Sequence, residues 1–120
     1  MAGTRILLLE DEPDIAELLA LALDGEGYVV DLAATVAEAR TRLDTLVYTL
    51  VIADLRLPDG DGLEIAERAA DLGAATFIMS GYLFQLERGT GTRHQLLMKP
   101  LRPSELVEAV RRRIGSPQEA

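Results

Sequence analysis

Side chains that could do chemistry follow the ends of several short apolar runs in this sequence. They are three carboxylates, one hydroxyl and one ammonium group: Glu10, Asp11, Asp54, Ser80 and Lys99. Three carboxylates held together would repel one another, and one would take up a proton unless cations compensate. Lys99 supplies one cation. A hard divalent ion with oxygen ligands, of which Mg²⁺ is the natural example, would supply a second.

Five apolar runs must position these groups, and they alternate with longer amphipathic stretches. The runs are residues 6–9, 29–33, 50–53, 76–79 and 95–98. Several contain no polar residue, which is typical of strands covered on both faces. Alternation of strands and helices predicts an α/β fold with a parallel sheet and helices on both faces. Ligands bind such sheets at the carboxyl ends of the strands, so all five groups are expected at one edge.

The helices are predicted from apolar residues at helical spacing and from residues that start or stop a helix. The stop and start signals are Pro13, Gly25, Gly73 and Pro103. The second helix is predicted from the stripe Val36, Ala39, Leu43 and Val47. Thr35 and Glu38 have the spacing of a capping box at its start.

Composition limits the class of protein. The chain has 120 residues, is 48% hydrophobic and carries a net charge of −8, and it contains no cysteine. We expect one domain over 1–120, with a core at about 4–114 and a polar tail at 115–120. The acidic balance argues against direct binding to nucleic acid. The N-terminal apolar stretch is too short for membrane insertion, and a cytoplasmic location is expected.

Each of these residues also has an ordinary structural explanation. A single Asp after a strand is most often a helix cap or a turn residue. The acidic residues at positions 10–12 could complement the dipole of the following helix. Such explanations do not account for acids after two strands, a hydroxyl after a third and a lysine after a fourth. The combination favours a functional site.

Four motifs in this order resemble the receiver domain of two-component response regulators. They are "LLLEDEPD", "VIADLRLPDGDGLE", "IMSG" and "MKP", and the resemblance extends from about residue 4 to residue 114. It implies a flavodoxin-like, CheY-like doubly wound sheet of five parallel strands in the order 2-1-3-4-5. It also implies a sensor histidine kinase or a histidine phosphotransfer protein as phosphoryl donor, and a downstream protein partner.

The resemblance assigns roles to the acidic residues. Asp54 would accept the phosphoryl group, which suits a carboxylate nucleophile. Mg²⁺ would be held by Asp11, Glu10, Asp54 and the backbone carbonyl of Arg56. Asp11 is expected to be the direct ligand, and Glu10 could act through water.

The resemblance also assigns phosphoryl contacts and a switch. Lys99 and Ser80 would bind phosphoryl oxygens, and Pro100 would follow a cis peptide bond. Most receivers have an aromatic residue three positions before the lysine, where this chain has Leu96. Tyr82 is a candidate substitute in the switch, although a core or surface tyrosine is an equally good interpretation.

The segment between Ser80 and Lys99 has room for only a short fourth helix. It would run from Tyr82 to Arg88, because the glycines that follow disfavour a helix, and we predict that it is short or mobile. This segment resembles that of a subset of receivers, often single-domain or attached to sensor kinases, that have a Gly-Tyr pair after the hydroxyl residue and a reduced fourth helix. His94 is predicted to be a solvated loop residue.

Two other functions remain open. A Mg²⁺-dependent phosphatase or phosphotransferase could also form an aspartyl phosphate. Those enzymes need an acid two residues after the nucleophile, where this chain has Arg56. A pseudo-receiver that binds partners without phosphorylation is less consistent with the full set of site residues. We therefore expect a signalling module that assists only its own phosphorylation and dephosphorylation, and that is not otherwise an enzyme.

Overall fold

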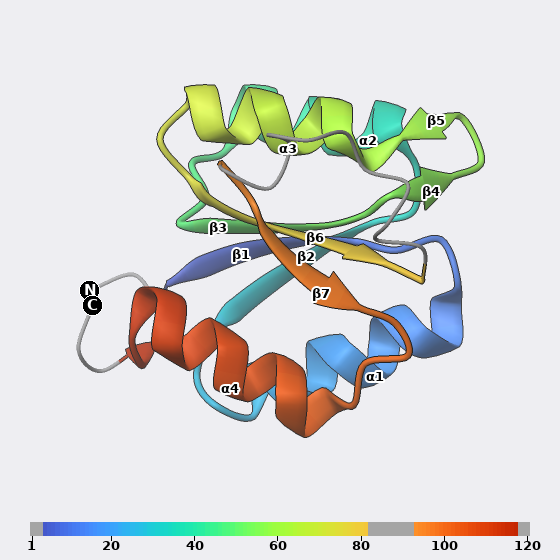
Figure 1. Cartoon of the computed structure of the whole chain (residues 1–120). Coiled ribbons are helices and arrows are strands. Elements are labelled where there is room, and N and C mark those ends of the chain that lie inside the picture. Colours follow the sequence, from blue (N-terminus) through green and yellow to red (C-terminus); the bar gives the residue numbers. More distant parts are fainter. Residues whose placement is uncertain (1–3, 82–92, 118–120) are drawn as a thin grey trace.

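A five-stranded parallel sheet forms the centre of the computed structural model, which describes residues 4–81 and 93–117 (Figure 1). Its strands stand in the order β2-β1-β3-β6-β7. Their bounds are β1 Arg5–Leu9, β2 Val29–Ala33, β3 Leu50–Asp54, β6 Ala75–Ser80 and β7 Gln95–Met98. Every pair of neighbours is parallel. The predicted order 2-1-3-4-5 is therefore confirmed.

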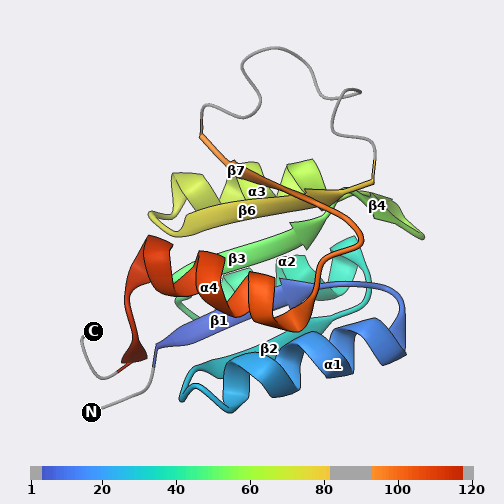
Figure 2. The same ribbon diagram turned by 60° about the horizontal axis from the view of Figure 1, so that its bottom comes forward.

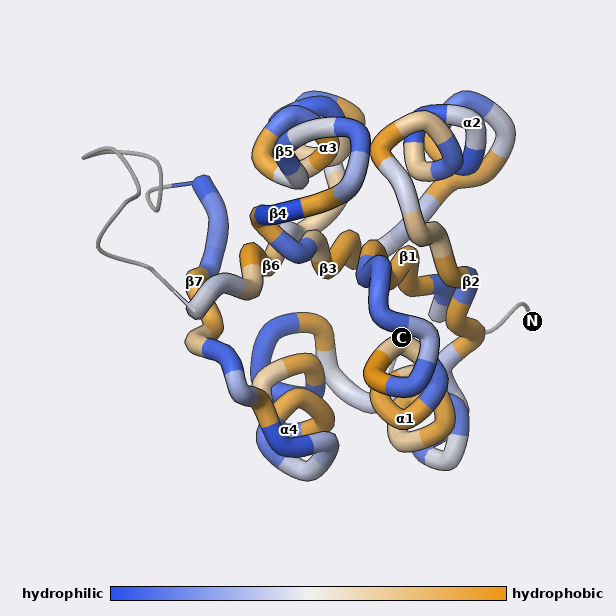
Figure 3. The backbone as a smooth tube through the Cα atoms, turned by 90° about the vertical axis from the view of Figure 1, so that its right-hand side faces the viewer, coloured by the Kyte–Doolittle hydropathy of each residue, from blue (hydrophilic) through white to orange (hydrophobic). Residues whose placement is uncertain are grey.

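Helices cover both faces of this sheet (Figure 2). Figure 3 shows α1 (Pro13–Asp24) and α4 (Pro103–Ile114) on one face, with α2 (Val36–Thr45) and α3 (Gly62–Asp71) on the other. Alternate residues of a strand point to opposite faces. Accordingly, Ile6 and Leu8 of β1 pack into the core under α1 and α4, whereas Leu7 and Leu9 pack into the core under α2 and α3.

Two details of the second helix differ from the prediction. Val47, expected on its apolar stripe, lies beyond the end of α2 and is 89% exposed. The chain leaves the helix at Leu46, which has an extended conformation that leads towards β3. The Thr35 side chain caps the backbone N–H of Glu38 as expected, but the Glu38 carboxylate accepts from Ala34 rather than from Thr35.

A two-stranded antiparallel hairpin between β3 and α3 was not predicted. It consists of β4 (Arg56–Leu57) and β5 (Gly60–Asp61), in which Arg56 pairs with Asp61 and Leu57 with Gly60. Strands of two residues are too short to produce a periodic pattern in a sequence. The hairpin begins two residues after Asp54 and therefore belongs to the surroundings of the site.

The predicted fourth helix, from Tyr82 to Arg88, lies outside the described residues. Among the helices that are described, none is both long and apolar enough to cross a membrane.

Candidate functional site

Three carboxylates meet at the carboxyl-terminal edge of the sheet. Glu10 and Asp11 follow β1, and Asp54 is the last residue of β3. One oxygen of each of the three carboxylates lies within 4.8 Å of the others. Glu10 and Asp54 are 2% and 6% exposed, whereas Asp11 is open to solvent. The parallel register of β1 and β3 brings these residues together from positions more than forty residues apart.

Lys99 joins two of these carboxylates. Its Nζ donates a hydrogen bond to Asp54 Oδ2 at 2.8 Å and another to Glu10 Oε1 at 3.0 Å. Burial by itself would lower the pKa of Lys99, but the hydrogen bonds to Asp54 and Glu10 outweigh it and raise that pKa. Burial raises the pKa of Glu10, and the hydrogen bond from Lys99 opposes this effect. The ammonium group therefore compensates carboxylates that have lost most of their water.

Backbone N–H groups orient the other oxygen of each buried carboxylate. Glu12 N–H donates to Glu10 Oε2 at 3.2 Å, and Arg56 N–H donates to Asp54 Oδ1 at 3.2 Å. Carboxylate oxygens can accept more than one hydrogen bond or metal contact each. This set of oxygen donors fits a hard divalent cation. The cluster could therefore hold a metal ion beside the ammonium of Lys99.

A cleft of about 250 Å³ opens over the cluster. Its lining residues are Asp11, Glu12, Asp54, Arg56, Ser80, Gly81 and Lys99. Ser80 is 4% exposed and ends β6, which pairs with β3 on one side and β7 on the other. The backbone N–H of Lys99 donates to the carbonyl of Ser80 at 3.0 Å, and the Lys99–Pro100 peptide bond is cis. The structure thus brings together the candidates from β1, β3, β6 and the end of β7.

Of the two remaining switch candidates, Leu96 and Tyr82, the described residues include only Leu96. Leu96 is half-buried in β7 and pairs with Ile78 of β6. It lies two residues before the end of β7, and strand β6 separates it from β3. Tyr82 lies outside the described residues.

Gly62 allows the hairpin and α3 to approach the end of β3. Its backbone N–H donates to the carbonyl of Leu55 at 2.9 Å. A Cβ atom at this position would lie 1.9 Å from the backbone oxygen of Asp54. Only glycine permits this approach, so Gly62 is required by a close contact with the site residue Asp54 itself.

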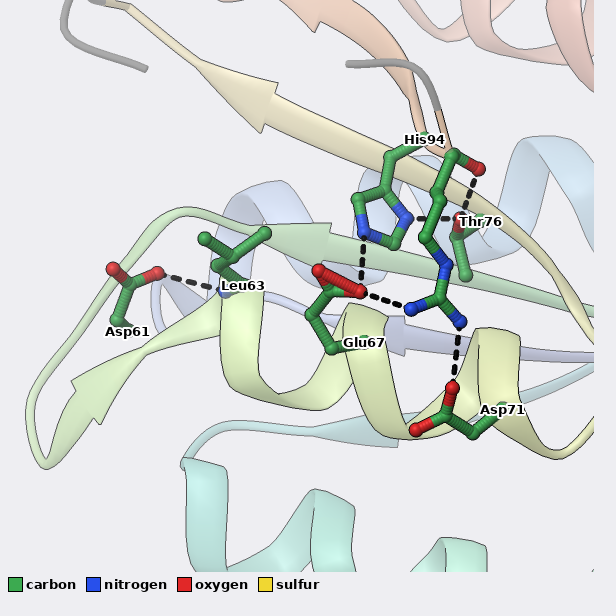
Figure 4. Close-up of polar contacts among 7 residues, drawn as sticks. Asp61, Leu63, Glu67, Asp71, Thr76 and His94 are labelled. Atoms are coloured by element: carbon green, nitrogen blue, oxygen red, sulfur yellow. Dashed lines mark hydrogen bonds and ion pairs between the residues drawn. The ribbon is translucent and has the colours of Figure 1, made fainter. Parts of the chain in front are cut away.

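His94 is not the solvated loop residue that was predicted. It is 2% exposed and lies just before β7, where its Nδ1 contacts Thr76 Oγ1 and its Nε2 lies 3.5 Å from Glu67 Oε1 (Figure 4). Burial lowers its pKa, and the negative charge of Glu67 opposes that shift. The adjacent Arg93 bonds to Glu67 at 2.7 Å and to Asp71 at 2.8 Å. These contacts fasten the start of β7 to α3.

Comparison with known proteins gives a consistent match. The family model described as the response regulator receiver domain matches residues 6–111. The DNA-binding response regulator MtrA of Mycolicibacterium smegmatis is 32% identical over 117 residues, which cover 92% of this chain and 50% of MtrA. The chain therefore spans half the length of this curated relative.

Solved structures show the same architecture. A CheY-like receiver domain protein from Methanospirillum hungatei has a TM-score of 0.82 and 28% identity, and the alignment covers 98% of both chains. The response regulator TrrA from Thermotoga maritima, solved in complex with Mg²⁺-BeF, has a TM-score of 0.80 and 31% identity. That alignment covers 91% of this chain and 97% of TrrA.

Proposed function

Because the chain belongs to the response regulator receiver domain family, we propose that it accepts a phosphoryl group on the carboxylate of Asp54 and thereby changes its affinity for a partner protein. The observation that carries this proposal is the position of Asp54. Its carboxylate lies at the floor of a cleft, oriented by Arg56 N–H and paired with Lys99, next to two further acids. Residues 4–114 would form the receiver unit.

The proposed reaction is a displacement at phosphorus. A carboxylate oxygen of Asp54 forms the new P–O bond, and the P–N bond to a phosphohistidine of the donor breaks. The imidazole leaves with its electron pair and takes up a proton from solvent. Such transfer depends mainly on positioning the nucleophile in line and on neutralising the charge of the phosphoryl oxygens.

Lys99 and Ser80 would supply part of that neutralisation. The Lys99 ammonium already lies 2.8 Å from Asp54 Oδ2, so it would move only locally to reach an oxygen of a phosphoryl group on Asp54. The Ser80 hydroxyl, on the adjacent strand, would donate to a second oxygen. Both contacts strengthen in a site that excludes water.

Mg²⁺ is the metal we propose for the acidic cluster. Asp11, Glu10, Asp54 and the carbonyl of Arg56 would hold it, and Mg²⁺ commonly retains several water ligands in such sites. Its charge would stabilise the phosphoryl oxygens during transfer. TrrA, the relative from Thermotoga maritima, was solved with Mg²⁺-BeF.

The phosphoryl donor is proposed to be a histidine kinase or a histidine phosphotransfer protein in the cytoplasm. A groove of about 400 Å³ runs beside α1 and includes Lys99 in its lining. Its apolar lining residues are Ile15, Leu18, Leu19, Met79, Pro100 and Leu101. We expect a donor that reaches Asp54 to cover this groove. Amide shifts on adding a phosphotransfer protein would map to these residues, whereas shifts confined to α2 would contradict this placement.

Catalysis of other reactions is not part of the proposal. An aspartyl-phosphate phosphatase needs an acid two residues after its nucleophile, and Arg56, which occupies that position, stays protonated and cannot donate readily. We expect the chain to assist only the gain and loss of its own phosphoryl group.

Intact mass measurement tests the proposal. The wild type, Asp54→Asn and Asp24→Asn are incubated with Mg²⁺ and acetyl phosphate. Asp24 is a matched control because it is an exposed carboxylate at the end of α1. The wild type and Asp24→Asn are expected to gain the mass of one phosphoryl group, and Asp54→Asn is expected to gain none. A gain in all three proteins would refute Asp54 as the acceptor.

A further inference from the structure

We propose that Asp59 is a positioning residue for the carboxylate of Asp54, an inference that rests on the function proposed above. Asp59 lies in the turn between β4 and β5, in the hairpin that begins two residues after Asp54. Its carboxylate accepts hydrogen bonds from the backbone N–H groups of Val36, at 2.8 Å, and Ala37, at 3.1 Å. These are the first two residues of α2, so the turn is fastened to a helix from another part of the chain.

The start of α2 is suited to hold this carboxylate. The first N–H groups of a helix have no partner within the helix, and the positive end of the helix dipole attracts negative charge. Thr35 satisfies the N–H of Glu38, and Asp59 satisfies the two N–H groups before it. The hydrogen bond from Val36, with that from Ala37, lowers the pKa of Asp59. Its carboxylate is therefore charged at neutral pH.

The hairpin connects this anchor to the phosphoacceptor. Arg56, the first residue of β4, donates its backbone N–H to Asp54 Oδ1 and pairs across the hairpin with Asp61 of β5. A two-stranded hairpin of this length is not stable by itself. Leu57 packs against the core beneath α2 and α3 and holds one strand. The bonds of Asp59 hold the turn, and so they restrict where the N–H of Arg56 can lie.

Two alanine variants separate this role from simple stabilisation of α2. Asp59→Ala removes the hydrogen bonds between the hairpin and the first N–H groups of α2. Thr35→Ala removes the hydrogen bond from the Glu38 N–H to the Thr35 hydroxyl, which caps α2 without involving the hairpin. Each is a loss of a helix cap and is expected to reduce stability similarly. In metal-free protein, hydrogen exchange of the Arg56 and Gly62 amides is expected to accelerate about threefold to tenfold in Asp59→Ala. The same amides should be unchanged in Thr35→Ala.

Phosphorylation gives a second measurement. With acetyl phosphate as donor, Asp59→Ala is expected to need about threefold to tenfold more Mg²⁺ for half the maximal rate, because less of the protein holds the competent geometry. Thr35→Ala should match the wild type. Asp59→Asn retains one acceptor oxygen and is expected to fall between the wild type and Asp59→Ala.

The outcomes for the two proposals are distinguishable. If the wild type is not phosphorylated, the proposed function fails, and hydrogen exchange alone still decides whether Asp59 holds the hairpin. If the wild type is phosphorylated and Asp59→Ala matches it in both measurements, the role of Asp59 is overturned. Equal effects of Asp59→Ala and Thr35→Ala would overturn it as well, because they would reflect only the stability of α2.

Discussion

Replacing Lys99 by Met should destabilise the metal-free protein strongly at neutral pH and much less in mild acid. Methionine keeps most of the length of the side chain and removes its charge. The two carboxylates that bond to the ammonium, those of Glu10 and Asp54, have side chains that are 0% and 8% exposed. Neither can regain its water without a change in structure, so the loss of Lys99 leaves negative charges buried beside each other.

The size of the effect follows from burial. Removing one partner of a buried ion pair costs about 3–5 kcal/mol. The Lys99 side chain is 24% exposed, so water already compensates part of its charge. We therefore expect a loss of about 2–3 kcal/mol at pH 8 in the free energy of unfolding. This corresponds to a decrease in Tm of about 8–12 °C for a domain of this size.

The pH dependence follows from Glu10. Burial already raises the pKa of Glu10 above 4.5, and Lys99 opposes that rise. Without Lys99, the pKa of Glu10 in the folded protein is expected to rise further. Between the pKa of the unfolded chain and that of the folded protein, Glu10 then holds a proton that the unfolded chain has released. Stability is therefore regained as the pH falls through the raised pKa of the folded state. We expect the loss to be smaller at pH 5.5 than at pH 8 by about 1 kcal/mol or more.

Urea unfolding followed by far-UV circular dichroism, in EDTA, measures both values. Circular dichroism is suitable because the sequence contains no tryptophan. Arg112→Met is a matched control, since it removes one positive charge from an exposed ion pair with Glu108. It should cost less than about 1 kcal/mol at either pH. The reasoning would be refuted if Lys99→Met lost the same free energy at both pH values, or no more than Arg112→Met.

Two further predictions concern the site and the contacts on α3. Burial lowers the pKa of His94, so the unfolded chain takes up a proton first as the pH falls below about 6.5, and stability declines. In urea unfolding, the free energy of unfolding of His94→Gln should differ between pH 7.5 and pH 5.5 by about 1 kcal/mol less than that of the wild type. An unchanged difference would contradict the lowered pKa of His94. Gly62→Ala should cost about 3 kcal/mol or more in the same assay, because its Cβ would overlap the backbone of Asp54. Gly81→Ala, where a Cβ meets nothing within 4 Å, is its control, and equal stability of the two variants would exclude the overlap.

The sequence was sufficient to predict the strands and the edge where the site lies. Four of the five apolar runs are followed directly by a residue with a polar or charged side chain, and parallel strands place their carboxyl ends together. Asp54, Ser80 and Lys99 could therefore be assigned to one edge of the sheet from the sequence, and in the structure they line one cleft. The order of the strands came from the resemblance, because local periodicity does not determine which strands are neighbours.

Such patterns do not predict contacts between segments that are distant from each other in the sequence. The burial of His94 depends on Thr76 and Glu67, which lie 18 and 27 positions earlier, and its own surroundings in the sequence are polar. Asp59 has the appearance of an ordinary turn residue after proline. Its bonds to α2 follow from the packing of two segments, and neither segment indicates them alone.

The two ends of the fold lie on the same side of the molecule, away from the acidic cluster. β1 begins, and α4 ends, at the end of the sheet opposite to the carboxyl ends of the strands (Figure 2). The Tyr28 hydroxyl bonds to the carbonyl of Gly115 at 2.7 Å and holds the last turn there. A fluorescent reporter or an additional domain could therefore be fused at either terminus, or a circular permutant joined across them, without covering the cleft over Asp54.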